Sequence, residues 1–402
     1  MPTESQEMGS FTTSKSDEED SRARPQWREA VATGLYHSGA LRIFQAISRY
    51  YELVPSNQRS LLRLRRTTRP KFAILCYHRI GIGGIPLFSD LPTEVFEAEM
   101  RFLRNHYRVV SLDALCEEME KPTRNGNAVA ITFDDGYRDL HTCALPALQK
   151  YQIPATIFLP VVSIETGQVP WYDRIFLAVK VFPKDDLEIL FDRPQRYRLI
   201  SDKARLQAAT EIIQYLRTLP DSRRKEHCEN LEKQVTLPSE ELKDRMLTWD
   251  QIRAMYRAGI TFGSHTMTHP VVSQLTEAQL ESELSESKRL LEERIAGPAL
   301  HFAFPFGKLA DCGTAALPVL VRCGYRSAAT TVEGVNVPGG GLFELRRTHV
   351  GGERSVSMFA CKLTQLFFSA GVISNNVSSV SSPLAGETFS DSGQGQARAN
   401  DA

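Results

Sequence analysis

Short apolar runs alternate with longer amphipathic segments through the central part of this chain, from Phe72 to Val350. The apolar runs predict strands at Phe72–Tyr77, Val129–Phe133, Ala155–Val162, Ile260–Gly263, Phe302–Phe304, Arg326–Thr330 and Glu344–Val350. Apolar residues at helical spacing predict helices at Glu94–Asn105, Leu140–Tyr151, Trp249–Ala258, Glu277–Ile295 and Gly313–Cys323. Strands that alternate with helices favour a parallel sheet, either open or closed into a barrel.

One long segment, from Trp171 to Leu247, interrupts this alternation. It is highly charged and mostly helical in character, with candidate helices at Ala204–Leu219 and Arg223–Gln234. We interpret it as a helical insertion between two strands, lying over or beside the functional site.

The two ends of the chain differ from the main domain, which we place at residues 71–370. Residues 1–24 are rich in Ser, Thr and acidic residues, and residues 371–402 are rich in Ser, Gly and Asn; both are predicted to be disordered. Residues 25–70 are predicted to form a helical extension that ends in a cluster of arginines. That extension either docks on the main domain or anchors the protein to an anionic membrane surface.

Composition narrows the class of protein. The 402 residues carry a formal net charge of +0, which gives no reason to expect nucleic acid as a partner. The N-terminus lacks the pattern of a signal peptide, and no apolar run is long enough to span a bilayer. The seven cysteines are scattered and form no CxxC pair, which favours free thiols in a reducing compartment. We therefore expect a cytoplasmic protein, with peripheral attachment to the inner face of the membrane as the alternative.

Two adjacent carboxylates follow a predicted buried strand. Asp134 and Asp135 come directly after Phe133, and Gly136 allows the chain to turn sharply there. Two neighbouring carboxylates repel each other, and a cation relieves that repulsion. Because adjacent side chains point in different directions, one carboxylate can bind a metal while the other faces a substrate. The alternative is a helix-capping aspartate.

Two histidines follow another predicted strand, Ile260–Gly263. His265 and His269 are four positions apart, so on a helical turn both imidazoles would face the same way and could share a metal. One carboxylate and two imidazoles make a three-ligand set for a divalent ion, and a second carboxylate beside it is a ready general base. The combination predicts metal-assisted hydrolysis.

The two motifs also carry a resemblance. Thr132-Phe133-Asp134-Asp135-Gly136 and Ser264-His265-Thr266-Met267-Thr268-His269 resemble motifs one and two of the polysaccharide deacetylases, the NodB-homology family of the carbohydrate esterase family 4 type. The similarity extends over residues 72–350. Shorter runs resemble one bacterial branch of the family: Leu75–Ile80, Tyr137–Asp139, Leu145–Leu148, Ile153–Phe158 and Trp171–Arg174.

The resemblance implies a fold and a set of roles. The fold would be a distorted (β/α)7-type barrel with active-site residues at the C-terminal ends of its strands. Asp135, His265 and His269 would hold a divalent metal, usually Zn²⁺, and Asp134 would be the general base. The backbone N–H of Tyr137 would help to stabilise the oxyanion that forms when water attacks an acetamide carbonyl.

The third motif departs from the pattern of the family. Ala303 stands where many members have an arginine that orients the catalytic carboxylate, so we predict that Arg347 takes this task. For the general acid, His78 at the end of the first strand is the first candidate and His349 the second.

Three residues are candidates for contact with substrate. Pro305 and Phe306 belong to the third motif, and Trp171 opens the insertion. Aromatic side chains at the rim of a site can stack on sugar rings, but they can equally pack the insertion onto the barrel.

These features predict a metal-dependent deacetylase that acts on an N-acetylated sugar, as part of an exopolysaccharide or envelope pathway. One alternative is a hydrolase of another amide on the same fold. A second is a degenerate sugar-binding homologue without activity. A third is a scaffold or membrane-docked protein in which the N-terminal extension matters most.

Overall fold

Seven parallel strands form one curled sheet in the computed structural model, which describes residues 32–34, 36, 69–81, 91–121, 125–238, 242, 245–351 and 355–369. The strands are β1 (Phe72–Tyr77), β2 (Ala128–Phe133), β3 (Ala155–Leu159), β6 (Thr261–Ser264), β7 (His301–Ala303), β8 (Ser327–Ala329) and β9 (Thr348–His349). Their order in the sheet is β8-β7-β6-β3-β2-β1-β9. All residues of β1, β2 and β3 are buried, as expected of parallel strands covered on both faces.

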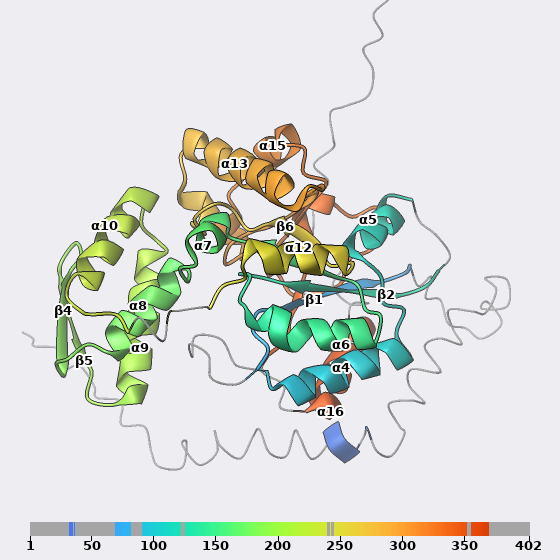
Figure 1. Ribbon diagram of the computed structural model, residues 1–402, viewed down its shortest axis with the longest axis horizontal. Helices are drawn as coiled ribbons and strands as arrows, with labels where there is room; N and C mark the ends of the chain where they lie inside the picture. Colours follow the sequence, from blue (N-terminus) through green and yellow to red (C-terminus); the bar gives the residue numbers. More distant parts are fainter. Residues whose placement is uncertain are drawn as a thin grey trace, which may run out of the picture.

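The connections between strands supply helices that cover the sheet. They are α4 (Thr93–His106), α5 (Leu112–Glu120), α6 (Leu145–Lys150), α7 (Val161–Thr166), α12 (Trp249–Arg257), α13 (Glu277–Ile295), α14 (Leu309–Cys312), α15 (Ala316–Arg322) and α16 (Val356–Ser369). Figure 1 shows α13 and α15 on one side of the sheet and α4, α6 and α16 on the other. The predicted (β/α)7-type barrel is confirmed by this architecture.

A segment near the end of the main domain contacts both edges of the curled sheet. Leu345 forms a parallel bridge with Ala329 of β8, and three residues later Thr348 pairs with Leu75 of β1. The segment Leu345–His349, which includes the edge strand β9, therefore connects β8 with β1. Its middle residue, Arg347, is fully buried.

The predicted insertion forms a lobe beside the sheet, at the left of Figure 1. It holds α8 (Trp171–Lys180), α9 (Asp202–Leu216) and α10 (Asp221–Glu232). It also holds an antiparallel hairpin of β4 (Asp186–Leu190) and β5 (Pro194–Arg198), which the helical prediction missed. Leu187 and Ile189 are buried and alternate with exposed Glu188, which is the period of a strand with one buried face.

Several element boundaries differ from the predictions for identifiable reasons. The strand Ala155–Val162 ends early because Pro160 cannot donate to a ladder and instead precedes α7. The helix Leu140–Tyr151 begins as five residues of π-helix before α6, which has Pro146 in its first turn. Gly313, with φ of 70°, separates α14 from α15. The predicted strand Glu344–Val350 shrinks to β9, since the chain changes from one sheet edge to the other within it.

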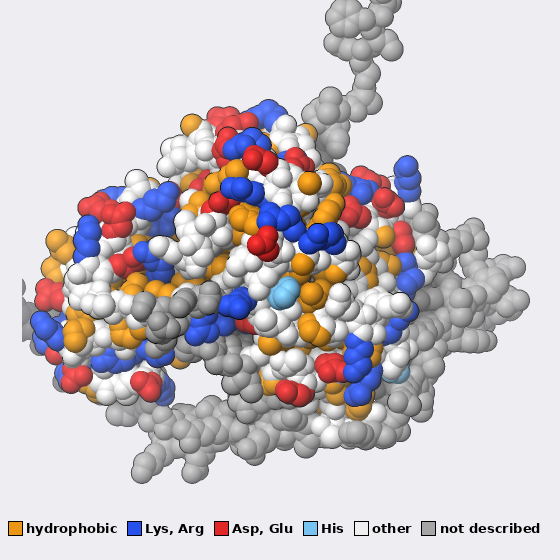
Figure 2. Space-filling view, viewed as in Figure 1, with side chains coloured by type: hydrophobic (Ala, Val, Ile, Leu, Met, Phe, Trp, Pro, Cys, Tyr) orange, Lys and Arg blue, Asp and Glu red, His pale blue; other side chains and the backbone are white. Residues whose placement is uncertain are grey.

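The surface and the ends of the chain add two findings. Figure 2 shows basic and acidic side chains interspersed over the visible face, so no single sign of charge dominates there. Among the described residues, no helix has both the length and the apolar character needed to cross a bilayer. The predicted disordered ends, and nearly all of the helical extension with its arginine cluster, lie outside the described residues, so those predictions stand as they were made.

Candidate active site

The carboxyl ends of four strands bring the predicted site residues to one edge of the sheet. His78 follows β1, the aspartate pair follows β2, His265 follows β6 and the Pro305 motif follows β7. Parallel strands present their carboxyl ends at one face of a barrel, where the connecting loops build active sites.

The two aspartates point in different directions because the chain turns between them. Asp135 and Gly136 both have positive φ, at 71° and 70°. A Cβ on Gly136 would lie 2.5 Å from a terminal side-chain carbon of Leu159, which would have to move, and a φ of 70° strains any residue with a side chain. The turn therefore favours glycine. As a result, Asp134 faces Arg347 and Asp135 faces the two histidines.

Asp135, His265 and His269 form a compact buried group. Nε2 of His265 lies 3.7 Å from Oδ1 of Asp135, and Nε2 of His269 lies 3.3 Å from the same oxygen. Ligand atoms about 2.1 Å from a tetrahedral ion are about 3.4 Å apart. The spacing therefore fits one small divalent ion bound by all three side chains.

The chemistry of this group also fits a cation. Oδ1 of Asp135 is buried and accepts no hydrogen bond from any residue that the structure describes, and burial raises the pKa of that carboxyl despite the attraction of His78 and His265. A nearby cation would offset the cost of burying a charged carboxylate. The three residues would hold the ion that the family uses, with Asp135 as its anionic ligand.

Both histidines are in the form that binds metals. Burial lowers the pKa of His265 to about 4 and that of His269 to about 3, so both rings are neutral at physiological pH. Nδ1 of His265 lies 2.7 Å from the carbonyl oxygen of Ala303, which as an acceptor assigns the proton to Nδ1. The lone pair on Nε2 then faces Asp135.

The two histidines do not lie on a helical turn, and that prediction was wrong. His265–His269 is an irregular loop after β6 in which Thr266 and His269 have φ of 69° and 56°. Local hydrogen bonds replace the helical ones: Thr266 N–H donates to the hydroxyl of Ser264, and His269 N–H donates to the hydroxyl of Thr266. The four-residue spacing brings the imidazoles together through this loop.

Arg347 pairs with the second carboxylate. Its guanidinium donates to both oxygens of Asp134, at 2.7 and 2.8 Å, and also to the carbonyl of Thr330 at 2.8 Å. Burial alone would raise the pKa of Asp134, but the attraction of Arg347 outweighs it and holds that pKa well below its usual range. The carboxylate is therefore fixed in orientation and ionised, as a general base requires.

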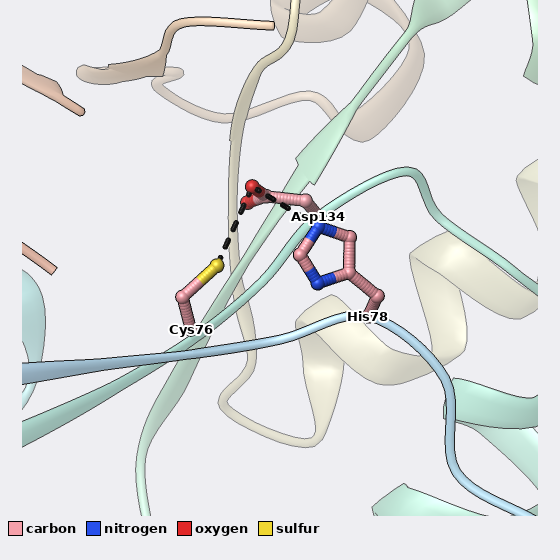
Figure 3. A group of neighbouring side chains, drawn as sticks. All are labelled: Cys76, His78 and Asp134. Carbon is pink, nitrogen blue, oxygen red and sulfur yellow. Dashed lines mark hydrogen bonds and ion pairs between the residues drawn. The ribbon is translucent and has the colours of Figure 1, made fainter. Parts of the chain in front are cut away.

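His78 and Cys76 complete the surroundings of Asp134. Figure 3 shows both side chains, from β1 and the residue that follows it, facing the carboxylate. The Cys76 thiol donates to Oδ2 of Asp134 at 3.5 Å, and Nε2 of His78 lies 4.0 Å from the same oxygen. Both oxygens of Asp134 already accept from Arg347, and burial keeps Cys76 a thiol by raising its pKa. We therefore interpret Cys76 and His78 as the surroundings of the proposed general base, Asp134, and not as ligands of a second metal ion.

The two candidates for the general acid lie side by side. The ring centroids of His78 and His349 are 5.2 Å apart. His78 is largely buried next to Asp134, whereas His349 is exposed. Burial lowers the pKa of His78 to about 4. Proximity to Asp134 thus favours His78.

The backbone N–H of Tyr137 is directed away from its neighbouring segment. Tyr137 and Met246 form an antiparallel bridge whose two hydrogen bonds come from the flanking residues, Arg138 and Leu247. In that pattern the bridged N–H groups point outward. The Tyr137 hydroxyl donates to Asp173 at 2.6 Å, so the side chain of Tyr137 points into the protein interior.

The three predicted substrate contacts lie together, at different depths. Pro305 is buried and Phe306 half-buried, with the Phe306 ring 5.0 Å from that of His269. Trp171 is only 8% exposed, and its indole N–H donates to the carbonyl of His269 at 3.0 Å. Trp171 therefore packs the insertion onto the barrel, and its contact with a sugar stays a prediction.

Similarity to known proteins shows which family this chain belongs to. The sequence model of the family described as "Polysaccharide deacetylase" matches residues 121–328, slightly more than half of the chain. The chain belongs to the polysaccharide deacetylase family. It is 24% identical over 306 residues to YxkH of Bacillus subtilis (strain 168), which bears the family name, covering 75% of this chain and 79% of that protein. Membership supports deacetylase activity for this chain.

Two further relatives bear on substrate and fold. Over 120 residues the chain is 31% identical to the poly-beta-1,6-N-acetyl-D-glucosamine N-deacetylase of Escherichia coli O157:H7, covering 29% of this chain and 18% of that enzyme. The solved structure of the Streptococcus pyogenes deacetylase PplD in complex with acetate matches with a TM-score of 0.50 at 19% identity. The match covers 75% of this chain and 99% of that one. The structural match supports the fold of this deacetylase.

Several residues at the site were not found from the sequence. Glu283 on α13 accepts hydrogen bonds from the loop between the two histidines, and no pattern distinguishes it among the many acidic residues of that helix. Two insertion arginines stack on the aromatic wall, Arg217 over Phe306 at 4.2 Å and Arg224 over Trp171 at 4.7 Å. The insertion therefore reaches the site, as its predicted position beside it requires.

Proposed function

We propose that this chain is a metal-dependent N-deacetylase, which hydrolyses the N-acetyl group of an N-acetylated saccharide. The observation that most strongly supports the proposal is that the two aspartates have different partners. Asp135 shares a buried group with His265 and His269, while Asp134 is held ionised by Arg347 immediately beside it. Zn²⁺ is the ion we propose, because two imidazoles and one carboxylate are a usual set for catalytic zinc.

Each residue of the site has its own role in the proposed reaction. An ion held by the three ligands would supply positive charge that acidifies the attacking water and stabilises the developing oxyanion. Asp134 accepts the proton of the water whose oxygen bonds to the acetyl carbon. The N–H of Tyr137 donates to the carbonyl oxygen as it becomes negative. The proton that Asp134 has taken from the water passes through His78 to the leaving nitrogen as the C–N bond breaks, which frees the base again, and the products are acetate and a free amine.

The substrate class rests on the relatives and on the wall of the site. We propose an N-acetylglucosamine-containing saccharide, in line with the substrate named for the Escherichia coli relative. Phe306, half-buried beside His269, is the aromatic surface best placed to meet a sugar ring. We place the reaction in the cytoplasm, with a lipid-linked or soluble precursor as substrate. Among the alternatives, the pairing of Arg347 with Asp134 argues against a degenerate homologue, because a binding module needs no oriented base.

The deciding experiment measures acetate release from N-acetylglucosamine oligomers by the purified protein. The protein is first treated with a chelator and then assayed with and without added zinc. We expect release that depends on zinc, and we expect Asp134→Asn to abolish turnover while it still binds the ion. Asp134→Asn that retained full activity would refute the assignment of the base. Release of acetate without any divalent ion would refute the metal dependence.

A further inference from the structure

The loop that carries both candidate metal-binding histidines is held by a carboxylate from outside it. One oxygen of Glu283, on α13, accepts from the backbone N–H groups of Met267 at 2.7 Å and Thr268 at 3.0 Å. Its other oxygen accepts from the hydroxyl of Thr268, also at 2.7 Å. Hydrogen bonds to an ionised acceptor are about twice as strong as neutral ones. The loop is therefore fastened to α13 at its midpoint.

Glu283 differs from the other acidic residues of its helix. Within the described part of the chain, no lysine or arginine forms an ion pair with it. By contrast, Glu286 pairs with Arg289 at 2.9 Å, and Glu292 pairs with Lys288 at 2.7 Å. The charge of Glu283 is thus balanced by the N–H and O–H groups of the loop.

The loop needs such support because it has no regular structure. Thr266 and His269 both adopt positive φ, which non-glycine residues seldom do. The ring of His265 is oriented by the carbonyl of Ala303, whereas Nδ1 of His269 bonds to no other residue in the described part of the chain. The position of His269 is set through its backbone instead, and Glu283 fixes the two residues that precede it.

We propose that Glu283 is a positioning residue for the metal site. By fixing Met267 and Thr268, it sets the separation between His265 and His269 that one ion requires. Glu283 itself touches neither the ion nor the substrate. The inference rests on the proposed function, since it assumes that a divalent ion binds at these histidines.

Zinc affinity tests this role directly. It is measured on the full chain by competition with a chromophoric chelator. We expect Glu283→Ala to bind zinc about 10- to 100-fold more weakly than the wild type, the usual effect of losing a residue that orients metal ligands. Glu286→Ala is the matched control, because it removes the same charge from the same helix and breaks only the pair with Arg289. Its zinc affinity should equal that of the wild type.

Thr268→Val provides a second test that keeps the shape of the side chain. It removes one of the three hydrogen bonds, and we expect a loss of about 5-fold in zinc affinity, the equivalent of one hydrogen bond. Because Thr268 acts through Glu283, the double variant should bind zinc no more weakly than Glu283→Ala alone.

The outcomes separate the inference from the function on which it rests. A folded Glu283→Ala variant with wild-type zinc affinity would overturn the positioning role alone. If that variant does not fold, Thr268→Val decides, and an unchanged affinity there would overturn the role. A wild-type protein that binds no zinc would overturn the proposed metal dependence together with this inference.

Discussion

Replacing Arg347 with Met would leave the Asp134 carboxylate buried without its cation. The guanidinium is fully buried and donates to both oxygens of Asp134, at 2.7 and 2.8 Å, and to the carbonyl of Thr330. Breaking a buried ion pair by removing one partner costs about 3–5 kcal/mol, because the remaining charge has no compensation. We expect R347M to lower the free energy of unfolding by that amount.

A double variant separates the pair from its two members. D134N alone leaves the guanidinium of Arg347 buried and unpaired, at a similar cost of about 3–5 kcal/mol. D134N/R347M carries no charge at either position, and neutral replacement of a buried pair costs little. We therefore expect the double variant to be more stable than either single variant.

The stability deficit of R347M should also depend on pH. In the wild type, burial opposes the ionisation of Asp134, but Arg347 outweighs it and depresses the pKa. The pair therefore stabilises the fold above the unfolded carboxyl's pKa of about 3.9, and this contribution is lost as the pH falls through the lower folded pKa. Without Arg347, burial raises the pKa of Asp134. The deficit relative to the wild type should then shrink as the pH is lowered from about 7 towards about 5.

Urea unfolding of chelator-treated protein measures these differences without help from a bound cation. Acetate release by the zinc-loaded variant gives the catalytic effect, which we expect to be a loss of at least about 10²-fold, the lower end for a general base. Two results would refute the reasoning. One is a cost below about 1 kcal/mol for R347M, which is the value of an exposed pair. The other is a double variant whose cost is the sum of the two single costs.

Three further perturbations test other parts of the site. Gly136→Ala would place a methyl group 2.5 Å from a leucine side chain at a φ of 70°, so we expect a loss of about 1–3 kcal/mol, and an unchanged melting temperature would contradict the packing described. His78→Gln should reduce acetate release by about 10²-fold while His349→Gln changes it little; the reverse order would give the proton transfer to His349. Trp171→Phe removes the hydrogen bond to the carbonyl of His269 and should weaken zinc binding about 10-fold in a chelator competition. An unaltered zinc affinity would leave Trp171 with packing or substrate contact alone.

The sheet was predictable because its strands are buried on both faces and stand out as apolar runs. Phe72–Tyr77 was predicted with its observed limits, and the helix Glu277–Ile295 likewise. The latter begins with a full capping box between Thr276 and Gln279. The helices Leu112–Glu120 and Val356–Ser369 were missed, although Ser111 caps the first by accepting from Ala114 N–H at 3.1 Å.

The candidate site was predictable where residues that can bind a metal or a proton directly follow a predicted strand. The prediction that Asp134 and Asp135 face different partners agrees with the structure, since positive φ at Asp135 turns the chain between them. The placement of Arg347 on Asp134 also agrees, while its role in turnover stays a proposal. The irregular loop of the histidines was not predictable, because four-residue spacing suits a helix equally well. Nor was Glu283, whose partners are backbone groups that carry no sequence signal.

The position of Arg347 in the chain has a consequence for how the protein becomes competent. Its partner Asp134 lies 213 residues earlier, and the family model ends at residue 328. During synthesis, both aspartates and both histidines leave the ribosome before Arg347, the partner of Asp134. A chain that ended before Leu345–His349 would leave the Asp134 carboxylate without the guanidinium that pairs with both of its oxygens. The segment that adds the last strand to the sheet is thus also the segment that completes the surroundings of Asp134.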